Sequence, residues 1–281
     1  MQYLTDFFYN LLVFFAYLTP GHYVWIGIVV ITVLIRLAFL KPSLKLVEVQ
    51  HKQKKLAPKL EELKGKHKDD KEALQRATLE LYKQEGVNPL SGCLPMIVQL
   101  VVLIAFYRIF TQIGMQDIKA EYLYSFVPRP DSINHFFFGI DLSKTVAQIF
   151  QGGGVVGYLS LLFPILAGGT QLIQSLQTRA LQPQVAQGDS AGFQKALNAQ
   201  FTYLFPLMTA YISYTLTSAL SIYWITQTLF MIVQQYYANK KFAELKEEIQ
   251  MVEATAVSQG ASKKVERTQK RGVVVEVREK N

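Results

Sequence analysis

The sequence predicts an all-α integral membrane protein with five core transmembrane helices. Of the 281 residues, 50% are of the types AVILMFWYC and only 18% are charged. The charged residues form blocks instead of alternating with apolar residues, as they would along the amphipathic helices of a soluble protein. Five windows are apolar enough to cross about 30 Å of hydrocarbon. These expected spans are about 23–40, 90–113, 155–176, 201–216 and 219–237.

Residues 1–20 are expected to form an N-terminal interfacial helix. The apolar stretch 7–18 ends at "TPG", and about 12 residues suit a helix lying in the membrane interface better than a span. The alternative is a sixth span, which would break the charge pattern described next. No Lys or Arg precedes Arg36, so we expect neither a cleavable signal peptide nor an organellar transit peptide, and a mature chain beginning near Met1.

The distribution of cations predicts the topology. Residues 41–89 carry twelve Lys or Arg, residues 239–281 carry ten and residues 114–154 carry three. Because cytoplasmic loops carry the excess of Lys and Arg, we expect a multi-pass protein with its N-terminus outside, its C-terminus in the cytoplasm and an external loop at 114–154. That loop contains "SINHFFFGIDL", an aromatic segment suited to a membrane surface.

The first basic block is expected to form a cytoplasmic helical hairpin over residues 43–86. Leu56, Leu60 and Leu63 recur at helical spacing, and "KGKHKDD" separates the two halves. Pro58 is expected to kink or restart the first helix. The charged faces of this hairpin suit either simple solvation or a docking surface.

Residues 241–281 are expected to form a basic cytoplasmic tail. The string "SQGASKKVERTQKRG" has no apolar periodicity, so we expect it to order only on an anionic partner. Anionic lipids and ribosomal RNA both fit this description. The net charge of +8 indicates topology more than nucleic-acid binding, and we expect no DNA partner.

Arg36 lies inside an apolar window, where a charged residue costs about 2.5–3.5 kcal/mol at the bilayer centre. One interpretation is snorkelling, because Lys41 marks the end of the window five residues later. The other is a wet cavity, because Thr32 lies one turn away and uncharged polar residues occur on the other spans. Those on the third span include Gln171, and none of the five windows contains Asp or Glu. Such a cation would attract anions or acidic peptide segments.

The sequence offers no site for an enzyme, a cofactor or a metal. The four histidines lie outside the spans without metal-ligand spacing, and Ser221 has no base near it in sequence. Cys93 is the single cysteine, which excludes an intramolecular disulfide. An ion-coupled transporter would need an ionisable partner at membrane depth and internal repeats.

The segment "EGVNPLSGCLPMIVQLVVLIAFYRIF", residues 85–110, resembles the signature of the YidC/Oxa/Alb membrane protein insertases. "ITVLIRLAFLKPS" and the closing "LTSALSIYWITQT" are similar to the first and last core spans of that family. The resemblance covers about residues 5–240 and is to the short bacterial form without a large external domain. Where many bacterial members have Pro-Ser-Gly between the last two spans, this chain has Thr217, Ser218 and Ala219.

The resemblance implies five core helices around a hydrophilic groove that opens to the cytoplasm and to lipid. It implies that Arg36 is the groove arginine, that Thr32 contacts substrate one turn deeper, and that Gln99 is a polar groove position. Tyr223 and Trp224 correspond to positions of the final span that contact nascent chains. With Gln171 from the polar pattern, these residues form the predicted substrate-binding groove.

The expected function is insertion and chaperoning of nascent membrane proteins in a bacterial plasma membrane, without enzymatic catalysis, alone or with the Sec translocon. The expected partners are nascent membrane proteins, ribosomes, the Sec translocon and anionic lipids. Two alternatives are a channel or carrier for an anionic solute, with Arg36 as its selectivity group, and a structural anchor that recruits ribosomes. The lack of repeats and the hairpin argue against the carrier, and the clustered polar residues argue against the anchor.

Overall fold

The structure is a computed structural model that describes residues 2–67, 70–87, 94–113, 119–180 and 199–258. The "NPLSGC" motif with Cys93, the polar loop between the third and fourth expected spans, and the last 23 residues of the expected tail (259–281) lie outside the described residues. The chain divides into two compact units, Met1–Ala238 and Asn239–Asn281. The packing described below belongs to the first unit, and the second contains the end of the last helix.

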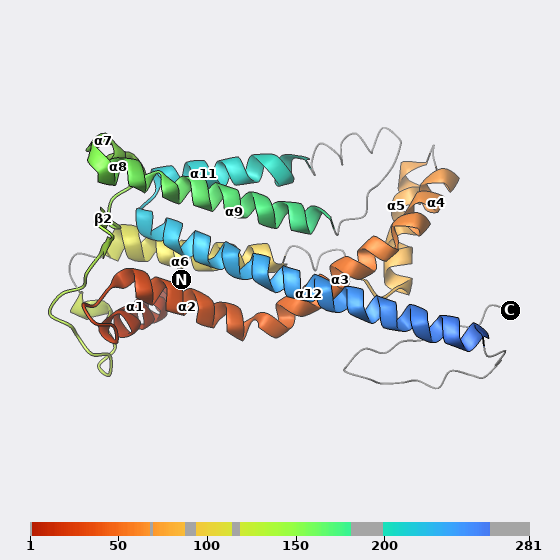
Figure 1. The fold of residues 1–281 in the computed structure, drawn as a ribbon, viewed down its shortest axis with the longest axis horizontal. Coiled ribbons are helices and arrows are strands. Elements are labelled where there is room, and N and C mark those ends of the chain that lie inside the picture. Colours follow the sequence, from red (N-terminus) through yellow and green to blue (C-terminus); the bar gives the residue numbers. More distant parts are fainter. Residues whose placement is uncertain (1, 68–69, 88–93, 114–118, 181–198, 259–281) are drawn as a thin grey trace. The chain divides into compact units, whose positions relative to one another are not determined.

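The described chain is mostly helical, as predicted (Figure 1). In its first half the elements are α1 (Gln2–Tyr17), α2 (Val24–Ala38), α3 (Leu40–Lys55), α4 (Ala57–Lys66), α5 (Lys71–Gln84), α6 (Leu94–Arg108) and the π-helical turn η2 (Ile109–Ile113). In its second half they are the short η3 (Ala120–Tyr122), strands β1 (Phe136–Phe137) and β2 (Ile140–Asp141), α7 (Val146–Gln151), α8 (Gly154–Ser160), α9 (Leu162–Arg179), the π-helical η4 (Gln200–Leu204), α11 (Phe205–Thr215) and α12 (Ser218–Ser258).

One helical stretch in the described part of the chain is long and apolar enough to span a membrane by itself. It is Gly154–Arg179, formed by α8 and α9, with 26 residues and a mean hydropathy of 1.5. The pair α2 and α3 would be a second if taken as one span, although the two helices are bent by 61°. The windows expected for the other spans are occupied by α2, α6, α11 and α12. The count of five spans stays a prediction.

Two close helix contacts organise the first unit. In α2, a Cβ at Gly27 would lie 3.0 Å from the Leu12 carbonyl oxygen, so α1 and α2 approach closely there. In α9, a Cβ at Gly168 would lie 2.9 Å from the Ala210 Cβ of α11. Small residues at such crossings let helix backbones approach each other in membranes.

The first part of α12 lies between α6 and α9 (Figure 1). On one side Tyr223 packs against Phe106 of α6, with ring centroids 4.8 Å apart. On the other side Trp224 donates a hydrogen bond to Gln171 of α9 at 3.2 Å. Consecutive residues on a helix point about 100° apart, so α12 presents different faces to its two neighbours.

α1 packs into the core of the unit and is tied to the following loop. Phe8 stacks on Phe106, with ring centroids 5.8 Å apart. The buried Asn10 side chain donates to the Tyr122 carbonyl and accepts from the Tyr124 N–H, each at 2.7 Å. This satisfies two backbone groups that would otherwise be costly to bury. Placement of α1 in the membrane interface stays a prediction.

The loop that precedes α7 ties together two distant turns of the chain. Asn134 exchanges backbone hydrogen bonds with the α1–α2 turn, donating to the His22 carbonyl at 3.0 Å and accepting from the Val24 N–H at 2.9 Å. At the α11–α12 turn, Ser218 donates to the Lys144 carbonyl through both its N–H and its Oγ, each at 2.9 Å. The sequence Thr217-Ser218-Ala219 therefore forms a turn bound to the predicted external loop.

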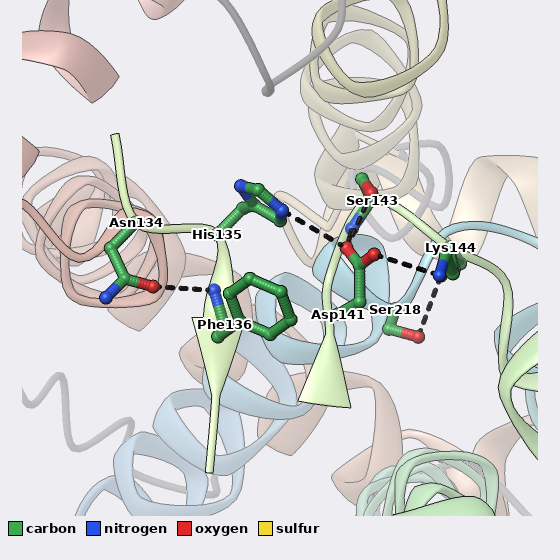
Figure 2. A network of polar contacts seen from close by, with 7 residues as sticks. All are labelled: Asn134, His135, Phe136, Asp141, Ser143, Lys144 and Ser218. Carbon is green, nitrogen blue, oxygen red and sulfur yellow. Dashed lines mark hydrogen bonds and ion pairs between the residues drawn. The ribbon is translucent and has the colours of Figure 1, made fainter. Parts of the chain in front are cut away.

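Asp141 is the centre of the polar network in this loop (Figure 2). Its Oδ1 accepts from the N–H and Oγ of Ser143 at 3.0 and 2.6 Å and lies 3.7 Å from the His135 Nε2. Its Oδ2 lies 3.5 Å from the Lys144 Nζ. Burial raises the pKa of Asp141, but the hydrogen bonds from Ser143 and the charges of His135 and Lys144 outweigh burial and lower that pKa below its usual range.

Asp141→Asn is expected to lower the free energy of unfolding by about 1 kcal/mol at neutral pH, because the half-buried Ser143 donors exchange a charged acceptor for a neutral one. A carboxylate with a lowered pKa stabilises the fold above its unfolded pKa, about 3.9, and this contribution is lost as the pH falls through the folded pKa. Thermal unfolding of both proteins should therefore differ at pH 7 and converge well below pH 4. Asp131→Asn, at an exposed position of the same loop, is the control. A gap that stays constant at all pH values would contradict this role.

The region of the predicted hairpin contains three helices with a small core of their own. α3 ends at Lys55, and α4 restarts with Pro58 in its first turn, where a missing N–H breaks no helical bond. Leu56, Leu60 and Val87 are buried together. Asp70 caps α5 by accepting from the Ala73 N–H at 2.9 Å. The cytoplasmic placement of these helices stays a prediction.

Candidate functional site

Arg36 lies in the last turn of α2, before the bend to α3 at Phe39. Thr32 lies one turn earlier on the same face and is buried, with its Oγ1 donating to the Ile28 carbonyl at 2.6 Å. The Arg36 Nη2 donates to the Gln99 Oε1 of α6 at 3.0 Å. The half-buried guanidinium is thus directed at a polar side chain of a neighbouring helix.

α12 contributes Tyr223 and Gln227 to the surroundings of Arg36. These two residues lie four positions apart, on the same face of the helix. Both side chains are buried. The Tyr223 hydroxyl lies beside Arg36 and Gln99 but forms no hydrogen bond of ordinary geometry within the described part of the chain. The Gln99 Nε2 is also buried without a partner among the described residues.

These side chains line a small, partly open pocket, which we call the Arg36 pocket. Its lining comes from α2, α6, α12 and the α2–α3 bend. The lining residues are Thr32, Ile35, Arg36, Phe39, Gln99, Val102, Tyr223 and Gln227.

The Arg36 pocket is chemically suited to bind a hydrogen-bond acceptor of another molecule. Arg36 is the single charged residue in its lining, and it forms no ion pair among the residues that the structure describes. The Gln99 Nε2 and the Tyr223 hydroxyl, buried beside each other, add polar character to the pocket without a hydrogen bond of ordinary geometry in the described residues. A carboxylate or a peptide carbonyl from another molecule could accept a hydrogen bond from the Arg36 guanidinium.

The structure brings together four of the six predicted site residues. Thr32, Arg36, Gln99 and Tyr223 line the pocket. The other two residues bind each other instead, since the Trp224 Nε1 donates to the Gln171 Oε1. The Gln171 Nε2 in turn donates to the Gln174 Oε1 at 2.7 Å. Gln171 and Trp224 therefore belong to a separate polar contact between α9 and α12.

Four further residues line the pocket but were not among the predicted site residues: Ile35, Phe39, Val102 and Gln227. Helical spacing could have identified three of them. Ile35 lies three residues after Thr32, Val102 three residues after Gln99 and Gln227 four residues after Tyr223, so each follows a predicted residue on one helix face. Phe39 lines the pocket because of the bend after α2, which Pro42 in the first turn of α3 could have indicated, because proline breaks the helix in the turn that precedes it.

Ser221 shows no catalytic arrangement. Its Oγ lies 2.8 Å from the Ser213 Oγ, so the two buried hydroxyls join α11 to α12. In the described part of the chain, no group of three or more His, Cys, Asp or Glu side chains could hold a metal ion. The Ser213–Ser221 contact is helix packing.

The known proteins that this chain resembles are membrane proteins of one family. The family model described as "60Kd inner membrane protein" matches residues 14–246. A Fusobacterium nucleatum protein named "Membrane protein insertase YidC" is 31% identical over 244 residues, covering 85% of this chain and 100% of that protein. A Legionella pneumophila protein of the same name is 32% identical over 230 residues, covering 82% of this chain and 34% of that longer protein. "Membrane protein insertase YidC 2" of Listeria innocua is 29% identical over 250 residues, covering 87% of this chain and 72% of that protein.

Proposed function

Because this chain belongs to the 60Kd inner membrane protein family, whose relatives include proteins named membrane protein insertases, we propose that it inserts proteins into the bacterial inner membrane. Its substrates are nascent membrane proteins. The function is not enzymatic, because moving a chain from water into lipid requires no bond to be made or broken. The Arg36 pocket is the proposed place where the substrate is received.

The observation that carries this assignment is an uncompensated cation beside neutral polar side chains. Arg36 contacts the neutral Gln99, and the adjacent Gln99 Nε2 and Tyr223 hydroxyl form no hydrogen bond of ordinary geometry in the described residues. A buried donor without an acceptor is unfavourable, so an entering acceptor gains more here than on an ordinary surface. An acidic residue or an exposed carbonyl of a substrate tail supplies such an acceptor.

The proposed mechanism lowers the cost of moving polar groups across the membrane. A charged residue costs about 2.5–3.5 kcal/mol at the bilayer centre on insertion scales. The pocket replaces part of the lost hydration with Arg36, Gln99 and Tyr223, so a short polar tail can advance part-way. The apolar segment that follows then partitions from the apolar outer faces of the helices into lipid.

The charge pattern supports an N-terminus outside and a C-terminus in the cytoplasm. The family resemblance supports five spans around a hydrophilic groove, of which we propose that the Arg36 pocket is a part. The hairpin region and the basic tail are proposed to contact ribosomes or anionic lipids, with the Sec translocon as a further partner. A channel or carrier for an anionic solute is not favoured, because the relatives are named insertases.

The test is site-specific photo-crosslinking to a ribosome-bound nascent membrane protein. Crosslinkers at Thr32, Gln99 and Tyr223 are expected to capture the nascent chain, because these residues line the pocket. Trp224 offers a matched control, since it neighbours Tyr223 in sequence but is directed to Gln171. We expect a weaker yield from Trp224 than from Tyr223.

Failure to crosslink from Thr32, Gln99 and Tyr223 alike would rule out the pocket as the substrate site. Equal yields from Tyr223 and Trp224 would show that the substrate contacts α12 from the α9 side as well. The second result would place Gln171 in the site, as the sequence predicts.

A further inference from the structure

The β1–β2 hairpin ends in a turn that is unfavourable for its sequence. Phe137 pairs with Ile140, so Phe138 and Gly139 form a two-residue turn. Both have positive φ, 47° and 84°, as in the turns that favour Asn-Gly. Glycine adopts this conformation freely, but a bulky residue such as phenylalanine is an outlier there. An outlier of this kind persists when the surrounding structure enforces it and often marks a functional position.

The hairpin is held firmly at its base. The Phe137 ring meets Trp25 of α2 edge-on at 5.3 Å and lies 5.8 Å from the Phe163 ring of α9. The Asp141 network fixes the other strand (Figure 2). Phe138 itself is 83% exposed. The fold therefore holds Phe138 outward, in a disfavoured conformation, with most of its ring covered by no part of the described chain.

The tip of this hairpin lies at one end of the stretch that is apolar enough to span the membrane. A Cβ at Gly139 would lie 3.8 Å from the Val156 Cγ2 of α8, and α8 begins the span Gly154–Arg179. Around that end the exposed apolar side chains of α8 and α9 continue to the tip. They are Val155, Val156, Tyr158, Leu159 and Leu162.

We propose that the hairpin tip is seated in the lipid bilayer, with the Phe138 ring among the headgroups and upper acyl chains at the α8 end of the span. The occupant of this surface is lipid because the apolar surface is continuous with the face of a membrane-spanning stretch. Aromatic residues gather at such interfaces. The tip carries no charge, since the five residues 136–140 are Phe, Phe, Phe, Gly and Ile. Such an anchor sets the depth and tilt of α9, which interfacial side chains are known to control.

Spin labelling tests the position directly. Cys93→Ser removes the single native cysteine, and Phe138→Cys then accepts a nitroxide in full-length protein in phosphatidylethanolamine–phosphatidylglycerol vesicles. We expect collisions with oxygen to dominate over collisions with a water-soluble nickel chelate. Ser132→Cys, an exposed polar position of the same loop, is the control. The oxygen-to-nickel ratio should be several-fold higher at position 138 than at position 132.

Two outcomes would overturn the proposal. A label at position 138 with the same nickel accessibility as the label at position 132 would place the tip in water. A label shielded from both reagents would mean that protein, and not lipid, covers the tip. If Phe138→Cys does not fold, Phe136→Cys supplies a second site on the same hairpin, 45% exposed in the native protein.

A second variant separates lipid contact from protein packing. Phe138→Asn places the favoured residue in this turn, so its thermal unfolding midpoint in detergent is expected to be unchanged or higher. A lower midpoint would show that the ring supports the protein core, which would overturn the proposal.

Discussion

Arg36→Met is expected to lower the insertion of substrates with an acidic translocated tail by about ten- to a hundredfold. Hydrogen bonds to charged groups contribute about 1.5–3 kcal/mol, and each 1.4 kcal/mol corresponds to a factor of about ten. Methionine keeps much of the apolar stem of Arg36 but removes the cation that faces Gln99. The measurement is protease protection of substrates translated in the presence of proteoliposomes that contain each variant.

Two controls distinguish charge recognition from structural damage. A substrate whose tail acids are replaced by Asn and Gln should be inserted almost equally by the native protein and by Arg36→Met. Arg36→Lys should keep part of the effect, because a lysine retains the charge but not the planar fork of donors. Equal insertion of the acidic substrate by all three proteins would contradict a role for Arg36 in the pocket and favour the snorkelling interpretation.

Gly168→Ala is expected to destabilise the protein, whereas Gly169→Ala is not. A Cβ at Gly168 would lie 2.9 Å from the Ala210 Cβ of α11, closer than real Cβ atoms come, and 3.2 Å from the Pro206 carbonyl oxygen, which is tighter than most Cβ contacts. Overpacking of this kind costs about 1–3 kcal/mol. A Cβ at Gly169 would meet nothing within 4 Å, and alanine is favoured over glycine in a helix by about 0.8–1.0 kcal/mol.

Thermal unfolding in detergent, followed by helical circular dichroism, would measure both variants. The unfolding midpoint should fall for Gly168→Ala and stay level or rise for Gly169→Ala. The two residues are adjacent and chemically identical, so a common change in midpoint would mean that the close contact of α9 with α11 does not control stability.

The sequence predicts the parts of this molecule that depend on local pattern. Helical spacing places Thr32 with Arg36 on one face, and the charge blocks and motifs predict the family to which the chain belongs. Trp224 shows the limit of this reasoning, because it is adjacent to Tyr223 but faces another helix. Which face of a helix meets which neighbour depends on the packing of the whole unit.

Long-range contacts account for most of what the sequence leaves open. Nothing near Ser218 indicates that it binds the Lys144 carbonyl, and nothing near Asn10 indicates its contacts with residues 122 and 124. The sequence "GG" at 168–169 likewise does not reveal which glycine touches α11. The bend at Phe39 is marked in the sequence by Pro42, but its angle and the side chains that it brings to the pocket are not.

The Ser218 contact determines which aromatic side chain Arg36 meets. Ser218 is the first residue of α12, and its N–H and Oγ are both fixed to one carbonyl oxygen. Five residues later comes Tyr223, and each residue inserted or deleted between them would turn the rest of the helix by about 100°. A one-residue deletion would bring Trp224 to the position of Tyr223. The contact of Ser218 with the Lys144 carbonyl therefore sets the rotation of α12 about its own axis. Through this rotation, a backbone oxygen in a distant loop determines which side chain faces the pocket.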